Sequence, residues 1–218
     1  STIVGIMSSL MNDPVKTYTI GFNDKRYDES PFADEAAKKF KTEHKCQKVE
    51  SNLLDLWSLA TYHSDQPHGD VSFLPTLKVS ELASRDVSVV LTGDGADELF
   101  AGYDKYLDFF SNFNSDEQSV FVDSYINQLI LFDEKSRSLL YKKNIAENID
   151  KTLTKKTVTD LISKVESWDF INQALYLDTI LLLPGNNLVK PDKMGMAYSI
   201  ENRAPFMDYR VVELAFSL

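Results

Sequence analysis

The feature that most constrains the fold is an abrupt change of pattern within residues 87–103, VSVVLTGDGADELFAGY. The continuous apolar run VSVVL is typical of a strand covered on both faces of a parallel sheet. Two glycines and three acids follow at once, and acids favour a helix start because they complement the helix dipole. The pattern therefore predicts strand, loop and helix, with Asp94, Asp97 and Glu98 beyond the carboxyl end of a buried strand.

Similar alternation marks the rest of the first hundred residues. Strands are expected at 15–22, 46–49 and 87–91, and helices at 1–11 (most of a buried helix), from Ser30-Pro31, at 51–62 and at 73–85. Strands that alternate with helices indicate βαβ units and a mostly parallel sheet. The predicted fold class is α/β, with a Rossmann-like parallel sheet that carries helices on both faces.

The second half of the chain has a different pattern. Residues 115–183 place apolar side chains at helical spacing, with Trp168, Phe170 and Tyr176 expected in a core. The run Pro184-Gly185-Asn186-Asn187 is expected to stop the last helix. We therefore divide the domain into an α/β part, residues 1–104, and a mostly helical part, residues 105–218.

Composition limits the class of protein. With 218 residues, 43% of them hydrophobic, the chain is long enough for a sizeable core. The net charge of −10 argues against binding nucleic acid or an anionic membrane through charge alone. Cys46 is the only cysteine, so no internal disulfide forms and the cytoplasm is the expected location. The sequence has no signal-like start and no apolar run of about 18 residues. We therefore expect neither secretion nor a membrane span.

The glycine–acid loop suits a phosphate ligand. Ligands of open α/β sheets bind beyond the carboxyl ends of the strands, and glycines let backbone N–H groups approach phosphate closely. Glu98 stands where a dinucleotide fingerprint needs glycine, and neither a Walker Gly-Lys-Ser/Thr nor the calcium-loop spacing is present. The remaining kind of phosphate site is one in which an acid holds a magnesium ion that binds the phosphate oxygens. The alternative is that the acids only complement the helix dipole.

Four segments, in order, resemble one family. TGDGADELFAGY resembles the motif S/T-G-[DE]-G-[AS]-D-E-x-F-x-G-Y in the synthetase domain of glutamine-dependent asparagine synthetases. Further segments similar to that family lie at 16–30 (KTYTIGFND-x-x-YDES), 65–76 (DQPHGDVSFLPT) and 188–215 (LVKPDKMGMAYSIENRAPFMDYRVVELA). The resemblance implies a sheet of the adenine-nucleotide α-hydrolase type, with ATP and Mg²⁺ as cofactors.

The resemblance also implies a nucleotide site. Family members activate the side chain of aspartate with ATP to give β-aspartyl-AMP and pyrophosphate, and ammonia then displaces AMP. Ile20 matches the position that touches adenine, and Thr92-Gly93 matches the pair beside the nucleotide. Asp97 matches the carboxylate that helps to hold magnesium.

Further matches concern the reaction and its substrate. Asp94 matches the catalytic acid that acts on the acyl-adenylate, where the family also has Glu. Asp70 and Tyr103 fall in segments that resemble the wall of the aspartate pocket, and Lys193 stands where the family has Arg or Lys. A carboxylate near the acyl-adenylate could accept a proton from the attacking amine.

Parts of the family pattern do not occur in these residues. The pyrophosphate loop S-G-G-x-D-S with its preceding strand, the segment R-x-K-x-x-F and the glutaminase domain are missing, and Cys46 has the wrong context for a glutaminase nucleophile. Ammonia is then expected from a glutaminase domain outside this chain. We expect these residues alone to be less stable than a longer domain, with exposed strand edges that a second copy could cover as a homo-oligomer.

Other readings stay open. A relative could adenylate another carboxylate, as β-lactam-forming members do, or the fold could serve as a non-catalytic binding module. His63, Asp65, His68 and Asp70 could be transition-metal ligands, although Pro67 and Gly69 favour a polar loop. Lys190 and Lys193 could reach phosphate or simply be solvated, and Glu201 with Arg203 is expected to be a structural ion pair.

Overall fold

The computed structural model describes residues 1–49 and 53–218. The chain forms two compact units. Unit 1 comprises residues 1–94 and 186–208, and unit 2 comprises residues 95–185 and 209–218. The chain therefore passes from unit 1 to unit 2 after Asp94, returns to unit 1 after Gly185 and enters unit 2 again after Asp208. The sequence-based division between residues 104 and 105 stays a prediction.

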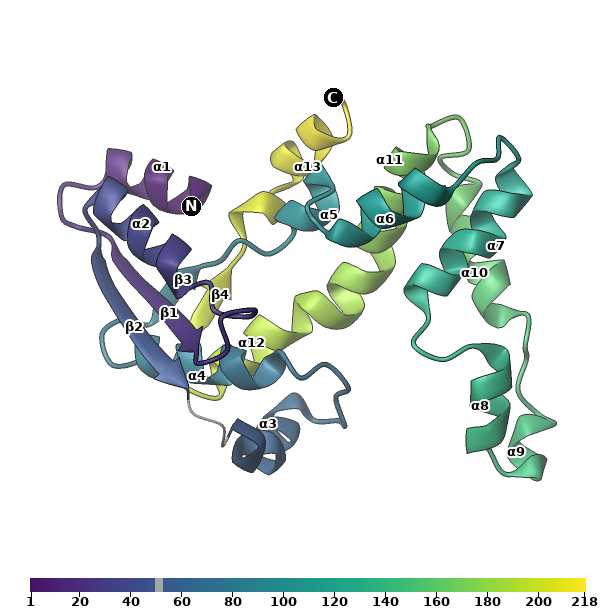
Figure 1. Cartoon of the computed structure of the whole chain (residues 1–218), viewed down its shortest axis with the longest axis horizontal. Helices are drawn as coiled ribbons and strands as arrows, with labels where there is room; N and C mark the ends of the chain where they lie inside the picture. The colour runs from purple at the N-terminus through teal and green to yellow at the C-terminus, as the bar shows by residue number, and fades with distance from the viewer. Residues whose placement is uncertain (50–52) are drawn as a thin grey trace. The chain divides into compact units, whose positions relative to one another are not determined.

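Unit 1 contains the strands. β1 (Lys16–Phe22) pairs in parallel with β2 (Glu43–Val49), and α2 (Ser30–Phe40) connects them (Figure 1). β3 (Val89–Leu91) pairs in parallel with β4 (Glu201–Arg203). The α/β class with parallel strands is thus confirmed, whereas the described strands form two sheets of two strands each and not one Rossmann-type sheet.

Helices supply the core of unit 1. Its remaining elements are α1 (Thr2–Leu10), the 3₁₀ helix η1 (Leu53–Leu56), α3 (Trp57–Ser64), α4 (Phe73–Ala83), α12 (Val189–Met196) and the 3₁₀ helix η3 (Pro205–Met207). Phe73, Leu74 and Leu77 of α4 pack with Ala60 of α3 and Met194 of α12. The first two residues of the helix predicted at 51–62 lie outside the described residues, and the rest of that range forms η1 and most of α3.

Two predictions about burial were wrong. Val89 and Leu91 of β3 are 42% and 39% exposed, because the only strand paired with β3 in the described part of the chain is β4. Helix α1 packs on α2, where Gly5 lies against Phe40, but it has no buried residue and its Ile6 is 55% exposed. Apolar sequence alone therefore overstated how well these two elements are covered.

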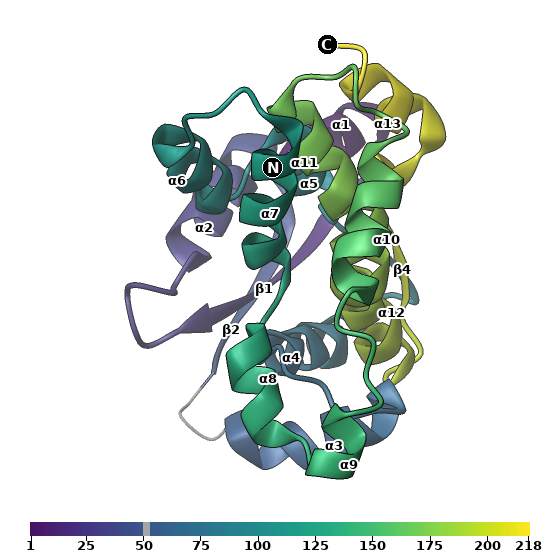
Figure 2. The same cartoon turned by 90° about the vertical axis from the view of Figure 1, so that its right-hand side faces the viewer.

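Unit 2 is helical over its described length, as predicted for residues 115–183. Its α-helices are α5 (Ala96–Phe100), α6 (Asp104–Asn112), α7 (Gln118–Leu129), α8 (Glu134–Leu140), α9 (Lys143–Ala146), α10 (Leu153–Ile162), α11 (Phe170–Leu177) and α13 (Tyr209–Ala215). α7 and α10 pack against each other, as Figure 2 shows.

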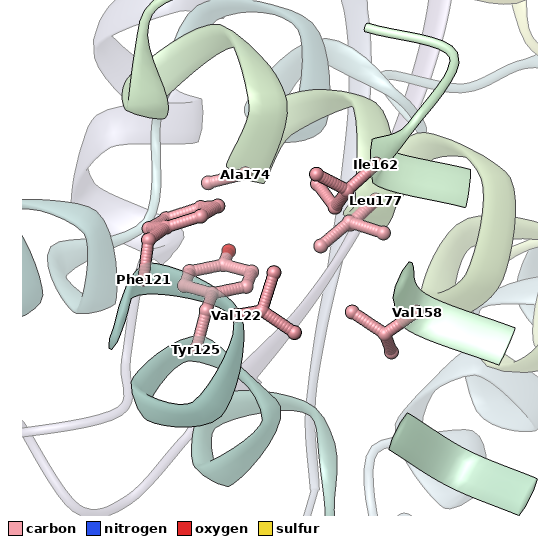
Figure 3. Packing of buried hydrophobic residues seen from close by; sticks show 7 residues of the cluster. All are labelled: Phe121, Val122, Tyr125, Val158, Ile162, Ala174 and Leu177. Carbon is pink, nitrogen blue, oxygen red and sulfur yellow. The ribbon is translucent and has the colours of Figure 1, made fainter. Parts of the chain in front are cut away.

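The core of unit 2 joins α7, α10 and α11 (Figure 3). It consists of Phe121, Val122, Tyr125, Val158, Ile162, Ala174 and Leu177. Phe170 stacks on Phe121 with ring centroids 4.6 Å apart, as its predicted core position required. Trp168 was wrongly placed in the core: it is 37% exposed and packs at the edge, on Tyr176 and Phe216.

The last helix does not stop at Pro184. α11 passes directly into a π-helix, η2 (Asp178–Asn187), which includes that proline. In an α-helix the proline ring would clash with the carbonyl four residues before it. Here the helical path continues through the predicted stop as a π-helix.

Candidate active site

The end of β3 in unit 1 offers groups that a nucleotide could use. The backbone N–H of Thr92 donates to the carbonyl of Arg203 at 2.9 Å, so pairing with β4 continues to this residue. The Thr92 hydroxyl is buried and has no hydrogen-bond partner among the described residues. A Cβ added at Gly93 would meet nothing within 4 Å, which leaves the backbone open to a ligand. Asp94, half-buried, follows directly.

Unit 2 begins with the rest of the loop. Gly95 has a φ of 89°, a left-handed conformation that favours glycine, and it precedes the single turn of α5. Asp97 is exposed in that turn. A Cβ at Gly102 would overlap Oδ1 of Asp97, so glycine at this position makes room for the carboxylate.

The neighbouring acid has a different environment. Glu98 is 1% exposed, and its Oε1 accepts a hydrogen bond of 2.8 Å from the hydroxyl of Tyr103. The loop therefore separates its two helical acids, with Asp97 toward solvent and Glu98 buried. Tyr103, expected in a substrate pocket, directs its hydroxyl to Glu98.

A second buried acid, Asp178, was missed by sequence reasoning. Its Oδ2 accepts hydrogen bonds from the hydroxyls of Tyr106 at 2.6 Å and Tyr125 at 3.1 Å, and it lies 2.5 Å from Nζ of Lys105. Burial, followed by the charge of Asp178, raises the pKa of both tyrosines above the usual range. No sequence spacing could show this cluster, because the tyrosines lie 72 and 53 residues from Asp178.

In unit 1, Asp70 forms a cluster with Lys190. Nζ of Lys190 lies 2.6 Å from Oδ2 of Asp70 and 2.8 Å from the hydroxyl of Ser72, and the amide of Asn186 donates to the same Oδ2 at 3.2 Å. Burial alone would raise the pKa of Asp70. The hydrogen bonds from Lys190 and Ser72 outweigh it and hold that pKa well below its usual range.

Lys193 does not join this cluster. It forms an ion pair of 2.7 Å with Asp65, which is 75% exposed. The structure therefore brings Asp70 together with Lys190, the lysine whose role the sequence left open, and pairs the expected substrate residue Lys193 elsewhere. Arg203 and Glu201 form the predicted ion pair, at 2.8 Å.

The expected adenine position lies in β1. Ile20 is half-buried and stands opposite Gln47 of β2. Two residues later the strand end is held by Asp28, whose Oδ1 accepts hydrogen bonds of 3.2 Å from the backbone N–H groups of Phe22 and Ser30. The carboxyl end of β1 is thus a fixed part of unit 1.

The donor groups fit magnesium carried by a nucleotide. Among residues 1–49 and 53–218, no three His, Cys, Asp or Glu side chains gather so that they could hold a metal ion by themselves. His68 of the suggested transition-metal cluster stacks on Phe73 instead. Mg²⁺ commonly binds through one or two carboxylates together with substrate phosphates. The exposed carboxylate of Asp97 fits that kind of site.

Within the part of the chain that the structure describes, the helices lack the combined length and apolar character that a membrane crossing requires.

Comparison with known proteins gives a consistent result. A family model described as asparagine synthase matches residues 1–218. The chain is 27% identical over 247 residues to asparagine synthetase (glutamine-hydrolyzing) 1 of Bacillus subtilis, across 99% of this chain and 38% of that protein. It is 41% identical over 109 residues to a putative asparagine synthetase (glutamine-hydrolyzing) 2 of Methanocaldococcus jannaschii, across 49% of this chain and 21% of that protein.

A more distant relative has another name. Amidase chyE of Penicillium rubens is 23% identical over 256 residues, across 97% of this chain and 38% of that protein. The chain thus spans only about 38% of the length of relatives that match nearly all of it. The match with the family model nevertheless covers every residue, so the chain belongs to the asparagine synthase family of ligases and carries its synthetase domain.

Proposed function

We propose that this domain uses ATP to activate the side-chain carboxylate of aspartate and passes it to ammonia, which gives asparagine, AMP and pyrophosphate. The observation that carries the proposal is the glycine–acid loop of the family motif. It follows a strand end with an unpaired, buried Thr92 hydroxyl, and it holds the Asp97 carboxylate exposed beside Gly102. Within the described part of the chain, the absence of a side-chain capping hydrogen bond at the start of α5 is consistent with a role for the acids of this loop beyond helix capping.

The first step joins aspartate to the nucleotide. A β-carboxylate oxygen of aspartate attacks the α-phosphorus of ATP, and the bond from that phosphorus to the bridging oxygen breaks as pyrophosphate leaves. Ile20 would contact adenine, while Thr92 and Gly93 would lie beside the nucleotide. Asp97 would hold Mg²⁺, which neutralises charge on the leaving pyrophosphate.

The second step forms the amide. Ammonia attacks the acyl carbon of β-aspartyl-AMP, AMP leaves with the bonding electrons, and Asp94 accepts the proton that nitrogen loses. We assign Asp70, Tyr103 and Lys193 to aspartate recognition, as the family resemblance implies. Asp70 would then act together with Lys190, its partner in unit 1.

The surroundings of the reaction are also part of the proposal. Relatives named as glutamine-hydrolyzing suggest that ammonia comes from a glutaminase domain outside these residues. We also propose a cytoplasmic location and self-association through the exposed strand edges.

A second candidate function keeps the activation of a carboxylate by ATP but uses a carboxylate other than aspartate, or a nucleophile other than ammonia. It is favoured by relatives named as amidases, which match 97% of the chain at 22% and 23% identity. A non-catalytic binding module is the third candidate, and the intact acids Asp94, Asp97 and Glu98 speak against it.

The test is pyrophosphate release with ATP, Mg²⁺, aspartate and ammonia. It is measured on this chain and on a version extended at both ends to the length of its relatives. We expect the extended protein to be active and this chain alone to be inactive. Asp97→Asn should abolish the activity of the extended protein, and Asp160→Asn, which changes an exposed acid on α10, should leave it unchanged.

Other outcomes would redirect the proposal. Pyrophosphate release with other carboxylates and not with aspartate would favour the second candidate. No release with any carboxylate, from a protein that still binds ATP, would favour the binding module.

A further inference from the structure

Asp178 is a buried charge with no evident packing purpose. Its side chain is completely buried, three donors share its Oδ2, and its Oδ1 has no hydrogen-bond partner in the described part of the chain. The apolar core of unit 2 adjoins it, since Leu177 and Tyr125 belong to that core. Burying a charge is costly, and an apolar side chain of similar size often stabilises a protein as well or better. The acid therefore calls for an explanation other than packing.

The cation that Asp178 holds lies beside the loop motif. Nζ of Lys105 is 5.4 Å from the ring centre of Tyr103 and 5.1 Å from that of Tyr106. The Lys105 side chain is 27% exposed, while that of Asp178 is fully buried. The ion pair therefore holds the ammonium group of Lys105 in place. Tyr103 is the last residue of the glycine–acid motif, and the ammonium rests on its ring.

A chain of contacts continues from Tyr103 to the metal-holding turn. Its hydroxyl donates to Glu98, which is adjacent to Asp97 in α5. α5 has only five residues, and so short a helix is not stable on its own. Its orientation therefore depends on contacts with other residues, and this series from Asp178 through Lys105 and Tyr103 supplies one.

We propose that Asp178 is a positioning residue that, through Lys105 and Tyr103, fixes the orientation of α5 and thereby the Asp97 carboxylate that receives Mg–ATP. The inference rests on the proposed function, because it assumes that Asp97 holds magnesium on a nucleotide. The position of Asp178 at the first residue of a π-helix is consistent with it, since such turns often occur at functional sites.

The first part of the test needs no ligand. Hydrogen exchange is followed by mass spectrometry in the parent, in Lys105→Met, in the conservative Lys105→Arg and in Lys155→Met. Lys155 is a matched control, because it pairs with Asp123 at 2.6 Å in unit 2 but both side chains are exposed. In Lys105→Met we expect amides of residues 96–103 to exchange roughly tenfold faster. Exchange in α7 and α10 should change little, Lys105→Arg should restore protection, and Lys155→Met should have no effect on α5.

The second part measures ATP binding to the version extended at both ends, by calorimetry with and without Mg²⁺. We expect Lys105→Met to raise the Kd for Mg–ATP about tenfold and to leave the much weaker binding of metal-free ATP nearly unchanged. Lys105→Arg should bind close to the parent. If Lys105→Met does not fold, the double variant Asp178→Asn/Lys105→Met removes both charges and takes its place.

The outcomes separate the two proposals. Uniformly faster exchange across unit 2, or unchanged exchange in residues 96–103, would overturn the positioning role. So would faster exchange in α5 with an unchanged Kd for Mg–ATP. An extended protein that binds no Mg–ATP would overturn the proposed function, and the positioning role for magnesium with it.

Discussion

The two units of this chain obtain their cores in different ways. In unit 2, α7, α10 and α11 surround a continuous cluster in which Phe121 and Leu177 are fully buried. In unit 1, the cluster around α4 is equally closed, with Leu77 at 0% exposure, but Val89 and Leu91 of β3 stay substantially exposed. A helix completes most of its own backbone hydrogen bonds, whereas a strand needs neighbours on both edges. Helical patterns can therefore be completed within unit 2, while the strands of unit 1 depend on what lies beside them.

Two tryptophans allow each unit to be followed separately. Trp57 belongs to unit 1 and packs on Phe73, with ring centroids 6.1 Å apart. Trp168 belongs to unit 2 and packs on Phe216, at 5.5 Å. The chain has no third tryptophan. Trp168→Phe thus leaves a reporter of unit 1, and Trp57→Phe leaves a reporter of unit 2.

The largest effect is expected from Phe121→Ala. This ring is fully buried and stacks on Tyr125 and Phe170, so its loss should lower the free energy of unfolding of unit 2 by about 3–5 kcal/mol. Urea unfolding followed by Trp168 measures it. Phe132→Ala, at a 47% exposed site, is the control. An equal shift of the Trp57 transition would show that the units unfold as one.

A similar loss is expected in unit 1 from Leu77→Ala. Leu77 is fully buried between helices, and its truncation should cost about 2–5 kcal/mol in the transition reported by Trp57. Leu54→Ala, at a site that is 68% exposed, should change this transition little. If Leu77→Ala proved as mild as the control, the core around α4 would not be what stabilises unit 1.

A smaller effect is expected from Gly195→Ala. A Cβ at this position would lie 2.7 Å from the carbonyl oxygen of Ile200 and would overlap the amide of Asn202. Because backbone must move, we expect a loss of about 1–3 kcal/mol in unit 1. Gly69→Ala, with nothing near its Cβ, is the matched control, and equal thermal stability of the two variants would contradict the prediction.

The smallest effect concerns acid and the pair Asp70–Lys190. Since the folded pKa of Asp70 is lowered, the pair stabilises unit 1 fully above the unfolded pKa of about 3.9, and this contribution is lost as the pH falls toward the folded value. Lys190→Met should therefore destabilise unit 1 at pH 7 and less so near pH 2.5. Urea unfolding with Trp57 at both values is the measurement. Lys193→Met, whose partner Asp65 is 75% exposed, should show a weaker dependence, and a pH-independent difference for Lys190→Met would exclude the pair as its cause.

Elements with a local signal were predictable from sequence. β1, α2 and α4 lie within a few residues of their expected places, because alternating or helical apolar spacing is read within one segment. β4 was missed because only three residues pair with β3, in a segment without β-branched side chains. The stop expected at Pro184 was wrong, because the chain continues through this proline as a π-helix.

The sequence by itself determined the family and the order of glycines and acids in the loop after β3. Glycine at positions 95 and 102 is a local requirement, which follows from the left-handed backbone of Gly95 and from the close contact between Gly102 and Asp97. Only the tertiary structure decided the partners of the buried and half-buried acids. Lys190 reaches Asp70 across 120 residues, and Tyr106 reaches Asp178 across 72. Such pairs form when the folded chain brings side chains together that are distant in sequence. The local spacing of residues in the sequence does not predict these contacts.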